Sequence, residues 1–229
     1  MKLDKKTSVF IGLFIVLGLV ALQFKLSNLA GSKVSFTVFD AFGPMAGAFL
    51  GPIFGALSVF LMQAINFLIH GAFAADWGTY VRFIPPLFAA MYFGKRTKLN
   101  IWVPLLAIVS FNIDPVGRSV WYYSLFWLIP IICYFWQERL LLARSLGATF
   151  MAHAVGGAIW IHAFALPKAV WIGLIPVVAM ERLLFAAGIA LSYLVLNNVI
   201  NLLVEKKLLS AGLTLDPRYL WRRKQGSHV

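Results

Sequence analysis

Long apolar runs separated by short basic clusters constrain this chain more than any other feature of its sequence. The runs reach about 18 to 25 residues, the length with which an α-helix crosses a bilayer, whereas outer-membrane barrels use segments of roughly ten residues. Of the 229 residues, 61% are hydrophobic and only 12% are charged. An ordinary soluble domain carries about 25% charged residues. We therefore expect an all-α, polytopic membrane helical bundle that forms a single transmembrane domain over residues 1–229.

Charges and turn residues divide the sequence into candidate helices. Two of them, 37–50 and 101–113, are too short to cross about 30 Å of hydrocarbon without help from neighbours. The last is too long, and it is expected to leave the membrane near Asn197 and to lead into a basic cytoplasmic tail, 205–229. The expected ranges are 8–29, 37–50, 52–70, 78–94, 101–113, 119–136, 145–164 and 169–204.

The distribution of lysine and arginine predicts the orientation of the chain. If all eight segments cross and both ends lie on one side, that side collects 14 basic residues and the other collects 4. The positive-inside rule then places both termini in the cytoplasm, as in a multi-pass protein of a prokaryotic plasma membrane. Six crossings, with 101–136 failing to span, keep the same orientation. The 14 residues are Lys2, Lys5, Lys6, Lys95, Arg96, Lys98, Arg139, Arg144, Lys206, Lys207, Arg218, Arg222, Arg223 and Lys224.

The net charge of +12 is explained by the same clusters. Because they lie between apolar runs, they indicate topology rather than a nucleic-acid partner, and the basic tail is expected to contact anionic lipid. The single cysteine, Cys133, lies within an apolar run, so neither an internal disulfide nor a cysteine-based metal site is expected.

The stretch GPMAGAFLGPIFG carries glycines at i, i+4 spacing, at Gly43, Gly47, Gly51 and Gly55, together with two prolines. One helix over 37–70 would be about 51 Å long, beyond the hydrocarbon core. A break is expected at Gly51-Pro52, because glycine suits a helix end and proline suits a first turn. The four glycines are expected to let another helix backbone approach closely.

This stretch and its surroundings resemble a known family. The segments FTVFDAFGPMAGAFLGPIFGALSVFLMQAINFLIHG (36–71) and RFIPPLFAAMYFGKR (82–96) are similar to the S-components of energy-coupling factor (ECF) vitamin transporters. The resemblance implies a six-helix core with an inserted helical hairpin over 100–136, and a separate coupling subunit with ATPases. The sequence departs from the family in its first helix, where Gly12, Gly18 and Ala21 replace an Ala-rich docking face.

Glu181 and Arg182 are the most informative charges, because they fall in the middle of an expected spanning helix. A charge at that depth costs roughly 2.5 to 3.5 kcal/mol on insertion scales, so it normally faces a partner or a polar cavity. Two interpretations stay open. Either the two charges join helices through an ion pair with Arg82 or His153, or they contact a ligand.

Other candidate ligand contacts lie near the expected outer face. By analogy with S-components, the loop with Asp76 and Trp77 helps to close a cavity that opens outward, where an aromatic ring can stack on a planar nutrient. Tyr123 and Trp171 are expected to belong to an interfacial aromatic belt, as are Trp121 and Tyr122. The expected substrate-binding residues are Asp76, Trp77, Tyr80, Arg82, His153, Trp160, Glu181 and Arg182.

No catalytic or metal site is expected. His153 and His162 are nine residues apart and point to opposite faces of one helix, so they cannot share an ion within it. No nucleotide loop is present, so any ATPase must be a separate chain. The expected function is a membrane-embedded substrate-binding subunit for a small vitamin-like nutrient, without a cofactor. The alternatives are a solitary facilitator, a non-transporting scaffold, or an intramembrane enzyme that uses Glu181 and His153.

Overall fold

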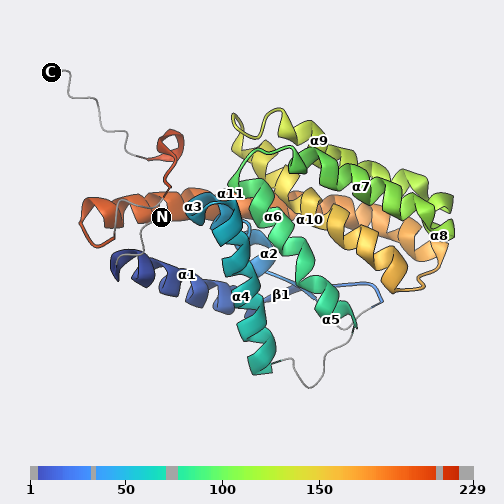
Figure 1. The fold of residues 1–229 in the computed structure, drawn as a ribbon, viewed down its shortest axis with the longest axis horizontal. Helices are drawn as coiled ribbons and strands as arrows, with labels where there is room; N and C mark the ends of the chain where they lie inside the picture. The colour runs from blue at the N-terminus through green and yellow to red at the C-terminus, as the bar shows by residue number, and fades with distance from the viewer. Residues whose placement is uncertain (1–4, 32–34, 71–76, 210–213, 222–229) are drawn as a thin grey trace.

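The computed structural model describes residues 5–31, 35–70, 77–209 and 214–221, and over these residues the chain is mostly helical (Figure 1). A short antiparallel hairpin is the exception to the all-α expectation. In chain order the elements are α1 (Lys5–Gln23), β1 (Lys25–Asn28), β2 (Ser35–Thr37), α2 (Phe39–Phe42), α3 (Met45–Leu50), α4 (Pro52–His70), α5 (Trp77–Arg82), α6 (Ile84–Gly94), α7 (Leu99–Ile113), α8 (Pro115–Ser119), the 3₁₀-helix η1 (Trp121–Trp127), α9 (Leu128–Tyr134), α10 (Leu141–Ala163), α11 (Lys168–Glu205) and the 3₁₀-helix η2 (Pro217–Tyr219).

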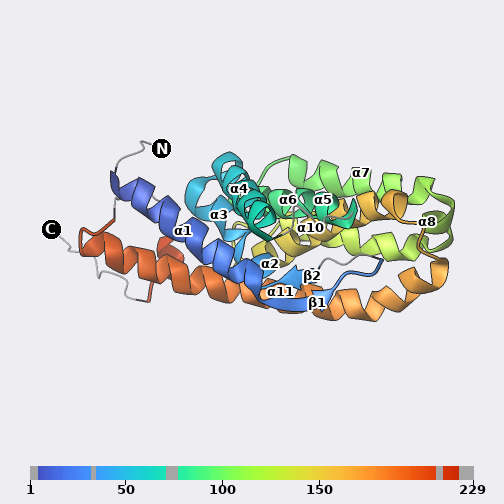
Figure 2. The ribbon, with the colours of Figure 1, turned by 90° about the horizontal axis from the view of Figure 1, so that it is seen from below.

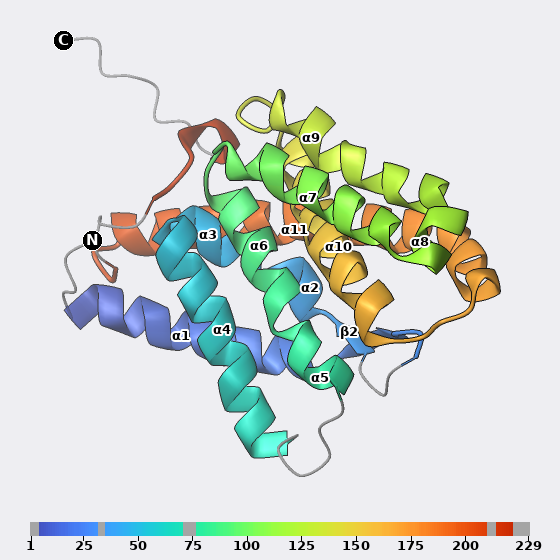
Figure 3. The same cartoon turned by 45° about the vertical axis from the view of Figure 1, so that its right-hand side comes forward.

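The helices pack around α6 and α10. Helix α6 contacts α3, α4 and α10, while α10 also contacts α7, α9 and α11 (Figure 3). Helices α1 and α11 run in opposite directions along the long axis, so the start of α1 and the end of α11 lie at the same end of the molecule (Figure 2). One apolar core lies around Phe49 and Phe93, and a second lies around Phe111, Trp127 and Trp171.

The break expected at Gly51-Pro52 is present. Helix α3 ends at Leu50, and α4 begins at Pro52. Gly51 between them has φ of 84°, a left-handed conformation that residues with a Cβ rarely adopt. Proline at the first helical position sacrifices no helical hydrogen bond, because its missing N–H would have had no intrahelical acceptor. The turn therefore folds α3 back against α4.

The glycine stripe serves two purposes rather than one. A Cβ on Gly47 would lie 1.8 Å from the carbonyl oxygen of Ala90 in α6, so this position requires glycine for close backbone packing. Gly55 approaches the backbone of Gly47, and Gly94, which the sequence analysis missed, does so from α6. The packing expectation was wrong for Gly51, because a Cβ there would meet nothing within 4 Å, and this residue instead forms the expected turn. The three heavy atoms nearest to a Cβ on Gly43 all belong to Phe39 of α2.

Four expected helices differ from the structure. The first, 8–29, ends at Gln23, because Lys25, Ser27 and Asn28 instead form the strand β1. The fourth, 78–94, is divided at Phe83, because Pro85 and Pro86 in the first turn of α6 have no N–H to continue the helix from α5.

The sixth expected helix, 119–136, begins as the 3₁₀-helix η1 rather than as an α-helix. The hydroxyl of Ser124 donates to the carbonyl of Trp121, a local bond that competes with regular helix formation. The second expected helix, 37–50, is likewise divided, because Thr37 belongs to β2 and residues 43 and 44 separate α2 from α3.

Two helices among the described residues are long and apolar enough to cross a membrane by length and composition, α4 and α11. Helix α11 has 38 residues and a length of about 57 Å at 1.5 Å per residue, so it extends beyond a 30 Å hydrocarbon layer.

The C-terminal segment 214–221 is fastened to α11 by two buried asparagines. The side chain of Asn197 donates to the carbonyl of Asp216 and accepts from its N–H, while Asn198 bonds in the same way to Tyr219 and Trp221. Arg218 hydrogen-bonds Asp216 and thereby lowers the pKa of that carboxyl below its usual value. The ionised form is therefore favoured at neutral pH, and its contribution to holding the segment is lost as the pH falls through this lowered pKa.

The double substitution Asn197→Ala/Asn198→Ala should release the segment 214–221. Each hydrogen bond contributes about 1 kcal/mol, so the loss of several should accelerate proteolysis there by roughly tenfold to a hundredfold. Asn201→Ala is the matched control, because Asn201 is bonded to Glu205 on the same helix. Equal cleavage of the double variant and the wild type would show that the asparagines do not hold the segment.

Candidate functional site

A cavity of about 100 Å³ lies between the β1–β2 hairpin, η1, α10 and the first half of α11. The hairpin closes one side, because Ser27 bonds to Glu181 and the ring of Phe36 packs against Phe185. The walls combine aromatic rings with buried polar groups. They include Asn28, Phe36, Tyr123, His153, Trp160, Trp171, Glu181 and Arg182.

Arg182 is the central charge of this cavity. Its side chain is 3% exposed, and its guanidinium carbon lies 4.4 Å from the centroid of Phe36 and 4.8 Å from that of Phe185. These cation–π contacts fix the position of the guanidinium. Its Nη2 atom is 3.6 Å from Oε2 of Glu181, and its Nη1 atom is 3.5 Å from the hydroxyl of Thr149. The two adjacent charges thus pair with each other and do not pair with Arg82 or His153, contrary to one of the two interpretations.

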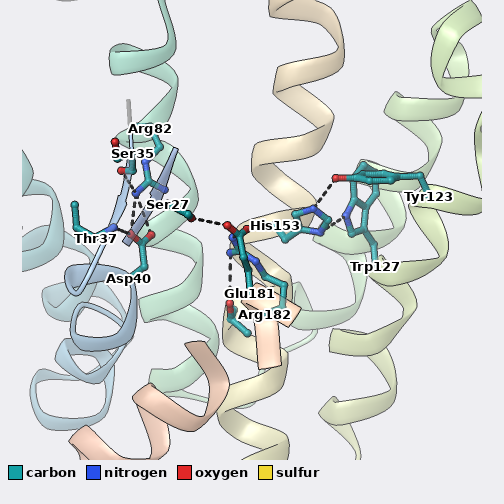
Figure 4. Close-up of polar contacts among 11 residues, drawn as sticks. Ser27, Ser35, Thr37, Asp40, Arg82, Tyr123, Trp127, His153, Glu181 and Arg182 are labelled. Carbon is teal, nitrogen blue, oxygen red and sulfur yellow. Dashed lines mark hydrogen bonds and ion pairs between the residues drawn. The ribbon is translucent and has the colours of Figure 1, made fainter. Parts of the chain in front are cut away.

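His153 is held between two aromatic residues of η1 (Figure 4). The indole N–H of Trp127 donates to Nδ1 at 3.1 Å, and the hydroxyl of Tyr123 lies 3.0 Å from Nε2. Because tryptophan can only donate, Nδ1 must be the unprotonated nitrogen of the ring. The imidazole is therefore neutral, with its proton on Nε2. This arrangement fixes η1 against α10 and exposes one face of Tyr123 to the cavity.

Trp160 connects α10 to the hairpin turn. Its indole N–H donates to the carbonyl of Ala30 at 3.0 Å, and its ring stacks on Phe164 at 4.2 Å between centroids. The expected binding residue thus forms a wall of the cavity and also anchors the segment that closes it.

Arg82 lies beside the main cavity. Its Nη2 atom donates to both carboxylate oxygens of Asp40, at 3.1 Å to Oδ1 and 2.9 Å to Oδ2, and its guanidinium lies 4.6 Å from the centroid of Phe36. Asp40, in the first turn of α2, also accepts from the N–H of Thr37. A smaller cavity of about 40 Å³ joins this pair to Arg182 and His153.

Two of the residues expected at the site, Trp77 and Tyr80, are not among the residues that line this cavity. Trp77 and Tyr80 lie on α5, are 62% and 51% exposed, and contact each other. Asp76 lies outside the described residues. A second, more polar cavity of about 290 Å³ lies next to α5, and its lining includes Lys25, Gln63, Asn66, His70 and Arg82.

Several lining residues were missed by sequence reasoning. Tyr123 and Trp171 were expected in the interfacial belt, but they are 3% and 1% exposed and line the cavity. Trp121 and Tyr122, their expected companions, are indeed exposed. Within η1, Tyr123 and the adjacent Ser124 are buried while Trp121 and Tyr122 are exposed, a difference that the aromatic composition did not reveal.

His153 and His162, both on α10, contact different elements. His162 contacts Ser110 of α7, whereas His153 contacts Tyr123 and Trp127 of η1. Within the part of the chain that the structure describes, no group of three or more His, Cys, Asp and Glu residues is placed to hold a metal ion. Cys133 is buried and has a free thiol.

The sequence is similar to a distant relative, but it matches no known protein family. No model of a known protein family matches the sequence, and no solved structure matches the chain. Over 177 residues, the chain is 26% identical to an uncharacterized protein of Methanocaldococcus jannaschii. The match covers 69% of this chain and 59% of that relative, so the chain spans less than two thirds of the relative's length. This similarity assigns no activity.

Proposed function

We propose that the chain is a membrane-embedded substrate-binding subunit that captures a small nutrient from outside the cell. The observation that carries the proposal is the cavity around Arg182, where two pairs of charges are buried between aromatic walls. Convergent polar groups in an apolar pocket are typical of small-molecule sites. Charges within a spanning bundle are costly and usually mark a substrate pathway.

The surface supports an integral membrane position. Helices α1, α4 and α11 expose large apolar side chains that water would solvate poorly. These include Leu13, Val16, Leu17, Ile53, Phe54, Leu57, Met180, Leu183 and Leu184. Acyl chains would cover them in a bilayer. The proposal therefore treats the molecule as a polytopic bundle with a six-helix core, to which α7–α9 are added.

Three segments with basic residues expected in the cytoplasm meet near the end of α6 and the start of α10. Arg144 bonds the carbonyl of Phe93, Asn100 bonds Gln137, and Arg218 bonds the carbonyl of Glu138. Lys95 and Lys98 lie in the first of these segments. In the proposed orientation this end faces the cytoplasm, and the hairpin and cavity open toward the outside.

The resemblance to ECF S-components suggests how transport would be driven. A separate ATP-driven coupling module would bind the subunit, and the whole protein would reorient with its ligand. The close glycine packing of α3, α4 and α6 would keep these helices together during that motion. This step is tested by purifying the tagged protein expressed with its native neighbours. Retention of a coupling subunit and a small molecule supports the proposal, and retention of neither contradicts it.

Glu181→Gln should weaken ligand binding about tenfold while leaving the fold intact. The amide keeps the size of the side chain and can still accept from Ser27, but it removes the charge that faces Arg182. Charged hydrogen-bond partners contribute about 1.5 kcal/mol or more, which corresponds to roughly a factor of ten. Glu205→Gln, at the exposed end of α11, is the matched control. If the folded Glu181→Gln variant binds the ligand with unchanged affinity, Glu181 is not part of the binding site.

The enzyme alternative receives less support from the geometry. Both ring nitrogens of His153 are engaged by Trp127 and Tyr123, so the imidazole is not free to act as a base toward a ligand. A solitary facilitator is distinguished by the same purification, since it would retain the small molecule without a coupling subunit.

A further inference from the structure

The cavity around Arg182 contains hydrogen-bond donors that no acceptor of the described residues satisfies. Among the described residues, Nε and Nη2 of Arg182 are buried and have no hydrogen-bond partner. The 3.6 Å separation from Glu181 is an ion-pair distance and is too long for a hydrogen bond. A buried polar group without a partner is costly, so these N–H groups indicate a site for an acceptor atom supplied by a ligand.

Tyr123 supplies another donor to the same space. Because Nδ1 of His153 accepts from Trp127, its Nε2 carries the proton and donates to the Tyr123 oxygen. The hydroxyl hydrogen of Tyr123 is therefore left to donate elsewhere, and Tyr123 lines the cavity. The indole N–H of Trp171, also a lining residue, is buried and has no hydrogen-bond partner in the part of the chain that the structure describes.

The charges of the site, in contrast, are already balanced. Arg182 faces Glu181, and Arg82 faces Asp40, so the four side chains sum to zero. Each of these side chains is at most 16% exposed. A ligand with a net charge would add an uncompensated charge to this enclosed space, which is strongly unfavourable in a low-dielectric environment. The site therefore favours acceptor atoms without a net charge.

Size and shape restrict the ligand further. The volume of about 100 Å³ is smaller than the cavity of about 150 Å³ that holds benzene in another protein, so the enclosed part of the ligand is at most one small ring. The walls include the rings of Phe36, Trp160 and Trp171, which favour a flat, stacked group. Glu181, which accepts a single hydrogen bond from Ser27, retains lone pairs for a ligand N–H.

We infer that the ligand presents a planar ring without net charge, whose carbonyl-type oxygens accept from Arg182 and Tyr123 and whose N–H donates to Glu181. Cyclic amides, imides and ureas have this chemistry. The inference rests on the proposed function, since it names the class of nutrient that the same cavity would capture. It excludes carboxylates, phosphates and quaternary amines as the group bound next to Arg182.

The test uses the purified full-length protein and a small-molecule extract of its native cells. The protein is equilibrated with the extract and washed, and the retained compounds are identified by mass spectrometry. Arg182→Lys keeps the charge but loses the planar fork, and Tyr123→Phe removes one donor from an otherwise similar ring. Arg118→Lys, on the exposed helix α8, is the matched control. Each variant is first shown to elute and melt like the wild type.

The inference predicts that the wild type and Arg118→Lys retain a ring compound that is uncharged at neutral pH, at least tenfold above Arg182→Lys and severalfold above Tyr123→Phe. A retained carboxylate, phosphate or cation would overturn the inference and leave the proposed function standing. Equal retention by Arg182→Lys would overturn the assigned contacts. If the wild type retains nothing, both the proposed function and the inference fail.

Discussion

Gly47→Ala should destabilise the protein by about 3 kcal/mol, at the upper end of the usual range for overpacking. The added Cβ would lie 1.8 Å from the carbonyl oxygen of Ala90 and 2.9 Å from the N–H nitrogen of Gly94, and both are backbone atoms of α6. A flexible side chain could move aside, but here two helices must separate. The expected result is a melting temperature in detergent that is several degrees lower, with reduced yield.

The matched control is Gly173→Ala, which introduces the same methyl group into α11. A Cβ at Gly173 would meet no heavy atom within 4 Å, so the change should stay within about 0.5 kcal/mol of the wild type. Thermal unfolding followed by tryptophan fluorescence measures both variants under one condition. Equal melting temperatures for Gly47→Ala and Gly173→Ala would show that α3 and α6 do not pack through glycine.

Breaking the Arg82–Asp40 pair should cost about 3 kcal/mol in either single variant, Arg82→Gln or Asp40→Asn. The two side chains are 13% and 10% exposed, so removing one partner leaves a nearly buried charge without its counterion. Asp40 also accepts from the N–H of Thr37, and Arg82 packs on Phe36, so the loss should loosen the hairpin over the cavity.

A double-mutant cycle separates this pair from simple loss of packing. The double variant Arg82→Gln/Asp40→Asn should lose clearly less than the sum of the two single variants, because it leaves no unpaired charge. Arg118→Gln is the control, since Arg118 is exposed and bonds only to carbonyls near its own helix. Additive losses in the cycle would mean that the two charges do not stabilise each other.

Local sequence signals predicted the parts of the fold that depend on backbone chemistry. Gly51-Pro52 fixed the turn between α3 and α4, because both residues have backbone conformations that few others share. Glu181 and Arg182 stood out because charges are rare within apolar helices, and the structure does place them at a cavity. Because burying a charge is costly, a charged residue within an apolar helix indicates a functional or structural role.

The hairpin and the aromatic walls of the cavity depended on tertiary contacts instead. Strand β1 is only four residues long and pairs across a turn with β2, so its pattern was too short to distinguish from the end of α1. Tyr123 was indistinguishable from its neighbours as an interfacial aromatic residue, since its burial follows from its bond to His153 on another helix. Trp77 and Tyr80 were expected at the site from the family analogy alone, and they do not line the cavity.

The proposed orientation has the Arg182 cavity open to the outside of a membrane and the basic end facing the cytoplasm. It is tested most directly by cysteine labelling of intact cells, starting from Cys133→Ser, which removes the single native cysteine. Asn28→Cys places a thiol at the exposed rim of the cavity, and Lys98→Cys places one in the exposed basic segment. A membrane-impermeant maleimide should label position 28 in intact cells and position 98 only after permeabilisation. The reverse pattern, or labelling of neither position before and both after permeabilisation, would contradict the claim.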